Sequence, residues 1–149
     1  MVTVLCTYAS AWGKLIQTYG MRNNVPYYEC VFSDVDGNKG SYAHGQYEGA
    51  MERNAFYVTE NGYYTLEFSH SGNCGTNVYF WKSGTYSETG TAYQSLSIPA
   101  YSPGMPSTLS KSCYFTKGYY DVEVICNTKG KTSNGSFRVY GVLERPQGG

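Results

Sequence analysis

The stretch that decides the fold is Asn61-Gly-Tyr-Tyr-Thr-Leu-Glu-Phe-Ser-His70, near the middle of the 149-residue chain. The apolar side chains of Tyr64, Leu66 and Phe68 occupy every second position. Because successive side chains of a strand point to opposite faces, this alternation predicts a strand with one face on a core. The Asn-Gly pair at its start tolerates positive φ and follows the short apolar run Ala55–Thr59, so the sequence predicts a hairpin here.

The same pattern returns later in the chain as Lys117-Gly-Tyr-Tyr-Asp-Val-Glu-Val124. Tyr114-Phe115-Thr116 precedes this copy much as Tyr57-Val58-Thr59 precedes the first one. Two similar strands, each entered through a glycine turn, predict two equivalent places in one sheet architecture. We therefore expect a second hairpin, formed by Leu109–Phe115 and Tyr119–Asn127.

The rest of the chain adds short strand patterns at near-regular spacing, separated by turns rich in Gly, Asn and Pro. Glu48–Asn54 is the one segment expected to form a helical turn, and the prolines of Pro99–Pro106 exclude a central strand there. The pattern predicts an all-β sandwich or barrel. The further predicted strands are Val2–Tyr8, Lys14–Tyr19, Tyr27–Ser33, Ser41–Tyr47, Asn77–Lys82, Tyr93–Ile98 and Ser136–Glu144.

Composition and charge argue against several classes of partner. The chain has 11 Lys+Arg and 11 Asp+Glu with no basic run, which argues against nucleic acid and against an anionic membrane. No segment approaches the roughly 20 apolar residues of a membrane span. Val2–Tyr8 lacks the regions of a signal peptide, so we expect synthesis in the cytoplasm. At this length we expect one domain over residues 1–145 and a flexible tail over 146–149.

The five cysteines are odd in number and contain no Cys-x-x-Cys pair. All but Cys74 lie on the more apolar side of a predicted strand. We expect free, buried thiols made in a reducing cytosol, and the alternative is one or two disulfides in a protein that matures outside the cell. The cysteines are Cys6, Cys30, Cys74, Cys113 and Cys126.

Three segments carry a family resemblance. The motif Phe56-x-Val58-x-x-x-Gly62-Tyr63-Tyr64-x-Leu66-x-Phe68 runs from a phenylalanine strand through a Gly-x-Tyr turn into an aromatic strand. This motif resembles the central segment of the jelly-roll heads of the complement-globular-head and tumour-necrosis-factor superfamily. Gly118–Val124 resembles a later strand of these heads and Ser136–Leu143 their closing strand, so the match covers roughly residues 55–145.

The resemblance implies an all-β antiparallel jelly-roll sandwich of about 8–10 strands that binds other molecules, usually as a homotrimer. Similar jelly rolls form the tips of bacteriophage fibres and decorate capsids. The chain departs from the family in lacking a collagen-like stalk, in a poorly matching N-terminal half, and in having Val142-Leu143 in place of the closing Phe-Leu pair.

Motifs that suggest chemistry have simpler explanations. Asp34-Val-Asp-Gly-Asn-Lys-Gly40 alternates oxygen ligands, but a helical calcium loop needs Gly at Lys39 and Glu at Gly45, so we expect a polar turn. His70 and Cys74 share a loop region without a third group to orient a catalytic pair. Neither these residues nor the isolated His44 predicts a metal site.

Two further signals are also weak. Asn134-Gly-Ser136 spells a glycosylation sequon, but a hairpin turn at Asn-Gly explains it better. The glutamates could supply the carboxylate pair of a glycosidase, as in any chain with this many acids, so they carry no specific signal. The glutamates concerned are Glu29, Glu48, Glu52, Glu60 and Glu67.

The 17 tyrosines are the most informative surplus. Tyrosine gives a large contact area at low side-chain entropy cost, with a hydroxyl for hydrogen bonding. We expect the loop residues Tyr86, Tyr93 and Tyr101 to bind a ligand, plausibly a sugar, by ring stacking. A two-layer core with scattered surface aromatics is the alternative. The strand residues expected to face outward and to contact neighbouring subunits are Tyr63, Tyr79, Trp81, Tyr119 and Tyr140.

The sequence thus predicts a non-enzymatic binding or assembly module without a cofactor. The leading hypothesis is a homotrimeric receptor-binding head on a virion surface, at a fibre tip or as capsid decoration, whose partner is a cell-surface glycan or protein. The alternative is a monomeric carbohydrate-binding module of a larger enzyme system. A small hydrolase is the third hypothesis. Neither nucleic-acid binding nor membrane insertion is expected.

Overall fold

The computed structural model describes residues 13–37, 49–87 and 89–147, and the backbone of residues 3–10. No helix in this part of the chain has the length and apolarity that a membrane span requires. The strands are β1 (Thr3–Ser10), β2 (Gly13–Arg22), β3 (Val25–Asp36), β4 (Ala50–Val58), β5 (Gly62–Phe68), β6 (Thr76–Lys82), β7 (Gln94–Ile98), β8 (Leu109–Phe115), β9 (Gly118–Cys126), β10 (Thr132–Tyr140) and β11 (Leu143–Glu144).

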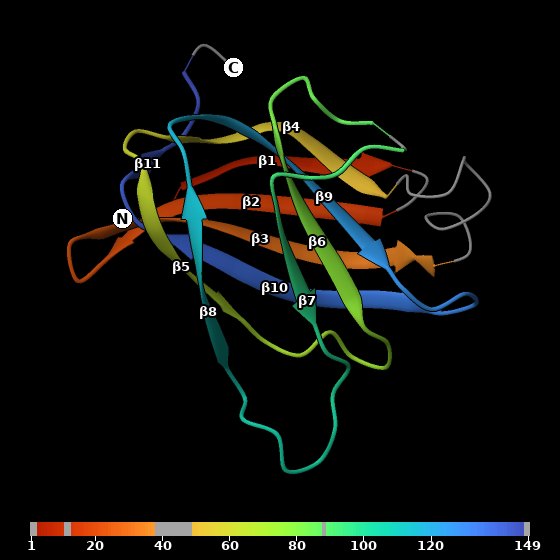
Figure 1. The fold of residues 1–149 in the computed structure, drawn as a ribbon. Helices are drawn as coiled ribbons and strands as arrows, with labels where there is room; N and C mark the ends of the chain where they lie inside the picture. Colours follow the sequence, from red (N-terminus) through yellow and green to blue (C-terminus); the bar gives the residue numbers. More distant parts are fainter. Residues whose placement is uncertain (1–2, 11–12, 38–48, 88, 148–149) are drawn as a thin grey trace.

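The strands form two antiparallel sheets that enclose one core (Figure 1). One sheet has six strands in the order β1-β2-β3-β10-β5-β8, and the other has five in the order β11-β4-β9-β6-β7. The core is rich in aromatic rings: Phe56 stacks on Tyr120 with a centroid distance of 5.5 Å, and Phe80 meets Phe115 edge-on at 5.4 Å. The predicted all-β sandwich is confirmed.

Eight of the strands pair as one long ribbon that folds back on itself. β3 pairs with β10, β4 with β9, β5 with β8 and β6 with β7, so the ribbon closes at the connection between β6 and β7. Successive strand pairs of the ribbon lie in alternate sheets. This wrapping is the topology of a jelly roll, and the jelly-roll prediction is therefore confirmed.

The two predicted hairpins are wrong. β4 and β5 lie in different sheets, and so do β8 and β9, so the chain crosses between the sheets at residues 59–61 and 116–117. Both crossings lie at the same bend of the ribbon, where the Lys117 backbone N–H donates to Asn61 Oδ1 at 2.7 Å. Turn residues mark a change of direction in both cases, and they do not say whether the next strand pairs with the previous one.

The repeated Gly-Tyr-Tyr motif has a structural role at these crossings. The Tyr64 hydroxyl donates to Glu60 O at 2.7 Å, and the Tyr120 hydroxyl donates to Thr116 O at 2.6 Å. Each ring therefore ties the start of a strand to the backbone of the crossing before it. A tyrosine corner in other β-sandwiches has the same arrangement, with the hydroxyl bonded to backbone a few residues upstream.

The helical turn predicted for Glu48–Asn54 is also wrong, because residues 50–58 form β4. A segment this short cannot sustain a helix alone, whereas pairing with β9 satisfies its backbone. The ladder is irregular between Glu52 and Phe56, and Asn54 has a φ of 50° there. The predicted strand Ser41–Tyr47 lies outside the described residues.

Two predicted turns lie within strands. β3 continues to Asp36, so Asp34 and Asp36 are strand residues, and Asn134-Gly lies inside β10 instead of at a hairpin turn. The two sites face each other where the register shifts, and the Asp34 backbone N–H donates to Asn134 Oδ1 at 3.1 Å. The side-chain amide thus replaces a bond of the ladder. The actual turn lies at residues 127–131, where Gly130 has a φ of 84°.

Candidate functional site

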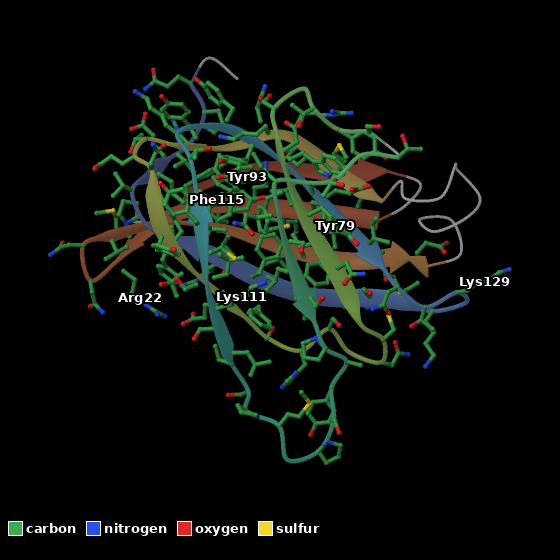
Figure 2. The ribbon with its side chains drawn as sticks, viewed as in Figure 1. Arg22, Tyr79, Tyr93, Lys111, Phe115 and Lys129 are labelled. Carbon is green, nitrogen blue, oxygen red and sulfur yellow. The ribbon has the colours of Figure 1, made fainter. Side chains whose placement is uncertain are left out.

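The three loop tyrosines predicted to bind a ligand do not gather at one site. Tyr86 packs edge-on against Trp81, with 5.1 Å between the ring centroids. Tyr93, which directly precedes β7, lies beside the core residue Phe115 and is 36% exposed (Figure 2). Tyr101 follows the other end of β7 and is 63% exposed. Their role in ligand binding stays a prediction.

The five aromatic residues predicted to contact other subunits also differ in their surroundings. Tyr63 on β5 and Tyr119 on β9 are exposed, on the outer faces of opposite sheets. Trp81 and Tyr140 are buried within the chain itself, and Tyr79 is half-buried. Tyr63 and Tyr119 therefore offer the most surface for a neighbouring subunit, and the interface stays a prediction.

His70 and Cys74 have separate partners in the structure. His70 Nε2 hydrogen-bonds to Pro106 O, while Cys74 Sγ is buried next to Cys126 Sγ. In the described ranges no group of three or more His, Cys, Asp or Glu side chains is placed to hold a metal ion. His44 lies outside the described residues.

A row of charged side chains lies on the outer face of the six-stranded sheet. Arg138 of β10 is the register partner of Glu29 on β3 and of Glu67 on β5, so the three side chains form one row across three strands. This row is part of the lining of a pocket of about 280 Å³. The other polar side chains that line the pocket are Arg22, Ser69, Thr108 and Ser136.

Arg138 is fixed at the centre of this row. Its Nε donates to Glu29 Oε2 at 2.7 Å and its Nη1 donates to Tyr140 Oη at 2.8 Å. Its guanidinium also lies over the ring of Tyr27, 4.2 Å from the centroid. Burial lowers the pKa of Arg138, but its hydrogen bonds to Glu29 and Tyr140 outweigh burial and raise that pKa overall. Arg138 therefore keeps its charge in a partly buried setting.

Glu67 on the other side of Arg138 pairs with a second guanidinium. Arg22 Nη2 lies 3.1 Å from Glu67 Oε2, and the Arg22 guanidinium lies 4.7 Å above the ring of Tyr140. Arg22 projects from the end of β2 and is about half exposed (Figure 2). The pocket lining thus contains two arginines and two glutamates, and its formal charges balance.

A pair of exposed rings lies further along β5. Tyr63 and Tyr114 are register partners on β5 and β8, and their ring centroids are 5.2 Å apart in an edge-on arrangement. Tyr63 is 78% exposed and Tyr114 is 39% exposed. Tyr63 is four residues from Glu67, which is about 13 Å along a strand. We call the outward row of these two strands the β5–β8 strip, and it consists of Tyr63, Thr65, Glu67, Ser110, Ser112 and Tyr114.

No family model and no curated protein matches this sequence. Among solved structures, the chain is similar to a carbohydrate-binding module from Cellvibrio mixtus lichenase 5A in complex with cellotriose. The two share 16% sequence identity with a TM-score of 0.43, over 91% of this chain and 97% of that chain. The resemblance to complement-globular and tumour-necrosis-factor heads therefore stays a prediction beyond the jelly-roll topology.

Sequence reasoning named Glu29 and Glu67 only among five glutamates without a specific signal, and it missed Arg138, although a signal was present. Arg138 and Glu67 each occupy a polar position between inward-facing apolar neighbours, which marks an outward side chain of a strand. The missing information was the register that aligns β3, β10 and β5, which are distant in the sequence.

Proposed function

We propose that this protein is a non-enzymatic carbohydrate-binding module whose ligand lies on the outer face of the six-stranded sheet. The observation that supports it best is the row Glu29–Arg138–Glu67 in the wall of the pocket. Guanidinium and carboxylate groups make strong, often paired hydrogen bonds. They therefore suit adjacent hydroxyl groups of a sugar ring, which both donate and accept.

Arg138 retains donors for a ligand. A guanidinium carries five N–H donors, and among the described residues Arg138 donates through Nε to Glu29 and through Nη1 to Tyr140. The remaining N–H groups are available to hydroxyl oxygens in the pocket. Because its neighbours already hold the side chain in place, binding costs little additional side-chain entropy.

The charges favour a neutral ligand. Arg22 and Arg138 are balanced by Glu29 and Glu67, so neither an anionic nor a cationic sugar gains a net attraction. The exposed ring of Tyr63 lies about 13 Å along β5 from Glu67 and offers an apolar surface to the C–H face of a sugar. The ligand is therefore a neutral oligosaccharide long enough to reach from the pocket to Tyr63 along the β5–β8 strip.

Binding fits this site better than hydrolysis. A glycosidase acid needs surroundings that favour its protonated form, such as an apolar pocket. Glu29 and Glu67 instead lie against guanidinium groups, with N–O distances of 2.7 Å and 3.1 Å. The two carboxylates are placed to hold ligand hydroxyls.

A trimeric head is the second candidate function. Tyr57 and Tyr119 form a ring pair on the outer face of the five-stranded sheet, with 4.6 Å between the centroids, and the proposed glycan site does not use it. Exposed tyrosines suit the core of a subunit interface. Light scattering distinguishes the two states, because a monomer has a mass of 16.5 kDa and a trimer three times that mass.

The experiment is a screen of neutral oligosaccharides on a glycan array, followed by titration calorimetry with the best ligand. Arg138→Met is expected to weaken binding at least tenfold, since a hydrogen bond to a charged group is worth about 1.5–3 kcal/mol. Tyr63→Ala is expected to weaken binding of longer oligosaccharides only. Tyr119→Ala, an exposed tyrosine on the other sheet, is the matched control. Unchanged affinity in Arg138→Met with intact circular dichroism would disprove the proposed site.

A further inference from the structure

We infer that Cys74 and Cys126 are joined by a disulfide in the mature protein. Their Sγ atoms lie 2.8 Å apart, which is closer than two unbonded sulfur atoms pack, and a disulfide bond is about 2.05 Å long. Both side chains are buried. The other two cysteines whose side chains the structure describes, Cys30 on β3 and Cys113 on β8, lie elsewhere in the core.

Backbone pairing alone places the two cysteines close together. Cys126, the last residue of β9, is the register partner of Thr76, and Cys74 lies two residues before Thr76. Just beyond this pair, the Asn127 backbone N–H donates to Gly75 O at 3.1 Å. The crosslink thus requires no rearrangement of the fold.

The crosslink would join two different bends of the ribbon. Cys74 lies in the crossing from β5 to β6, and Cys126 begins the crossing from β9 to β10. The two residues are 52 positions apart in the sequence. Cross-links that close long loops restrict the unfolded chain most, so this disulfide is placed to stabilise the fold.

The bond forms by exchange with an external disulfide. The thiolate of one cysteine attacks the external disulfide, which gives a mixed disulfide and releases one thiol. The second cysteine then attacks the mixed disulfide, closes the Cys74–Cys126 bond and releases the second thiol. The two cysteines lose two hydrogens, and the external disulfide is reduced to two thiols. Burial beside Cys126 raises the pKa of Cys74 to about 11, so we expect exchange before the crossing is buried.

The test uses the full chain, reduced and then refolded in a buffer of oxidised and reduced glutathione. After an acid quench, alkylation with excess iodoacetamide in denaturant at about pH 8 should modify three of the five cysteines. Peptide mapping without reductant should find a linked pair that contains Cys74 and Cys126. Cys113→Ser should keep this linked pair, and Cys74→Ser should lose it.

A stability measurement adds an independent readout. Reductant should lower the unfolding temperature of the wild-type chain and leave that of Cys74→Ala/Cys126→Ala unchanged. Alkylation of all five cysteines after refolding, or a linkage of Cys74 to another cysteine, would overturn the inference. The mapping of the wild-type chain decides the question even where a variant fails to fold, and neither result bears on glycan binding at the outer face of the six-stranded sheet.

Discussion

Replacement of Tyr120 by phenylalanine tests the role of the tyrosine at the ribbon bend. The Tyr120 hydroxyl donates to Thr116 O at 2.6 Å and accepts from the Thr116 backbone N–H at 3.1 Å. Tyr120→Phe removes both bonds and the 3.3 Å contact of the hydroxyl with Thr116 Oγ1, and it keeps the ring, which is fully buried and stacks on Phe56. The change therefore isolates the contribution of one hydroxyl to the stability of the crossing.

The expected loss of stability depends on which polar groups lose a hydrogen-bond partner in Tyr120→Phe. Each of the two hydrogen bonds contributes about 1 kcal/mol net. The Thr116 carbonyl keeps Lys82 Nζ as a donor at 3.3 Å, so the main additional cost falls on the Thr116 N–H. We expect the free energy of unfolding to fall by about 2 to 3 kcal/mol. With a urea m-value of about 2 kcal/mol/M, the midpoint should fall by roughly 1 to 1.5 M.

The assay is urea unfolding followed by circular dichroism, with Tyr119→Phe as the control. Tyr119 is the adjacent residue, is 42% exposed and lies on the outer face of the sheet, so loss of its hydroxyl should change stability by less than about 0.5 kcal/mol. Equal stability of the two variants would show that the corner hydroxyl does not hold the crossing, and the physical account of the Gly-Tyr-Tyr repeat would be wrong.

Three further outcomes are expected. Gly141→Ala should destabilise the protein by about 3 kcal/mol or more in thermal unfolding, because a Cβ there would lie 2.2 Å from the Tyr64 ring. The control is Gly62→Ala, which should have little effect because a Cβ there meets nothing within 4 Å. Arg138→Met should cost about 1 kcal/mol of stability in the same assay, since its ion pair is only partly buried, so its effect on glycan binding can be measured in folded protein. Burial raises the pKa of Cys113 and limits access to it, so the native thiol should react with iodoacetamide at least tenfold more slowly at pH 8 than in urea, as followed by peptide mass spectrometry.

Local patterns in the sequence predict most strands because alternation and turn residues are local properties. The range Leu109–Phe115 agrees fully with β8, and Asn77–Lys82 differs from β6 by one residue. The hairpins at the Gly-Tyr-Tyr motifs could not be distinguished from crossings, because pairing in a jelly roll joins strands distant in sequence. Asn134 shows a related limit, since the same residue type serves a turn or a bulge.

The candidate site was less predictable than the fold. Its centre, Arg138, is unremarkable as a single residue, and its role arises from its alignment with Glu29 and Glu67. The loop tyrosines were predicted to bind a ligand because the high tyrosine content of the chain is visible in its composition. Composition does not reveal that Tyr93 lies beside Phe115 with about a third of its surface exposed, whereas Tyr63 is mostly exposed.

The folded-back ribbon has a consequence for how the chain acquires its structure. Every described strand after the β6–β7 connection forms its ladders only with strands that precede this connection. The second half of the chain therefore has no sheet of its own. During synthesis on the ribosome, neither sheet can be completed until the last strands have emerged. If the chain were divided at that connection, the two fragments would be expected to associate, because each contains the strands with which the strands of the other fragment pair.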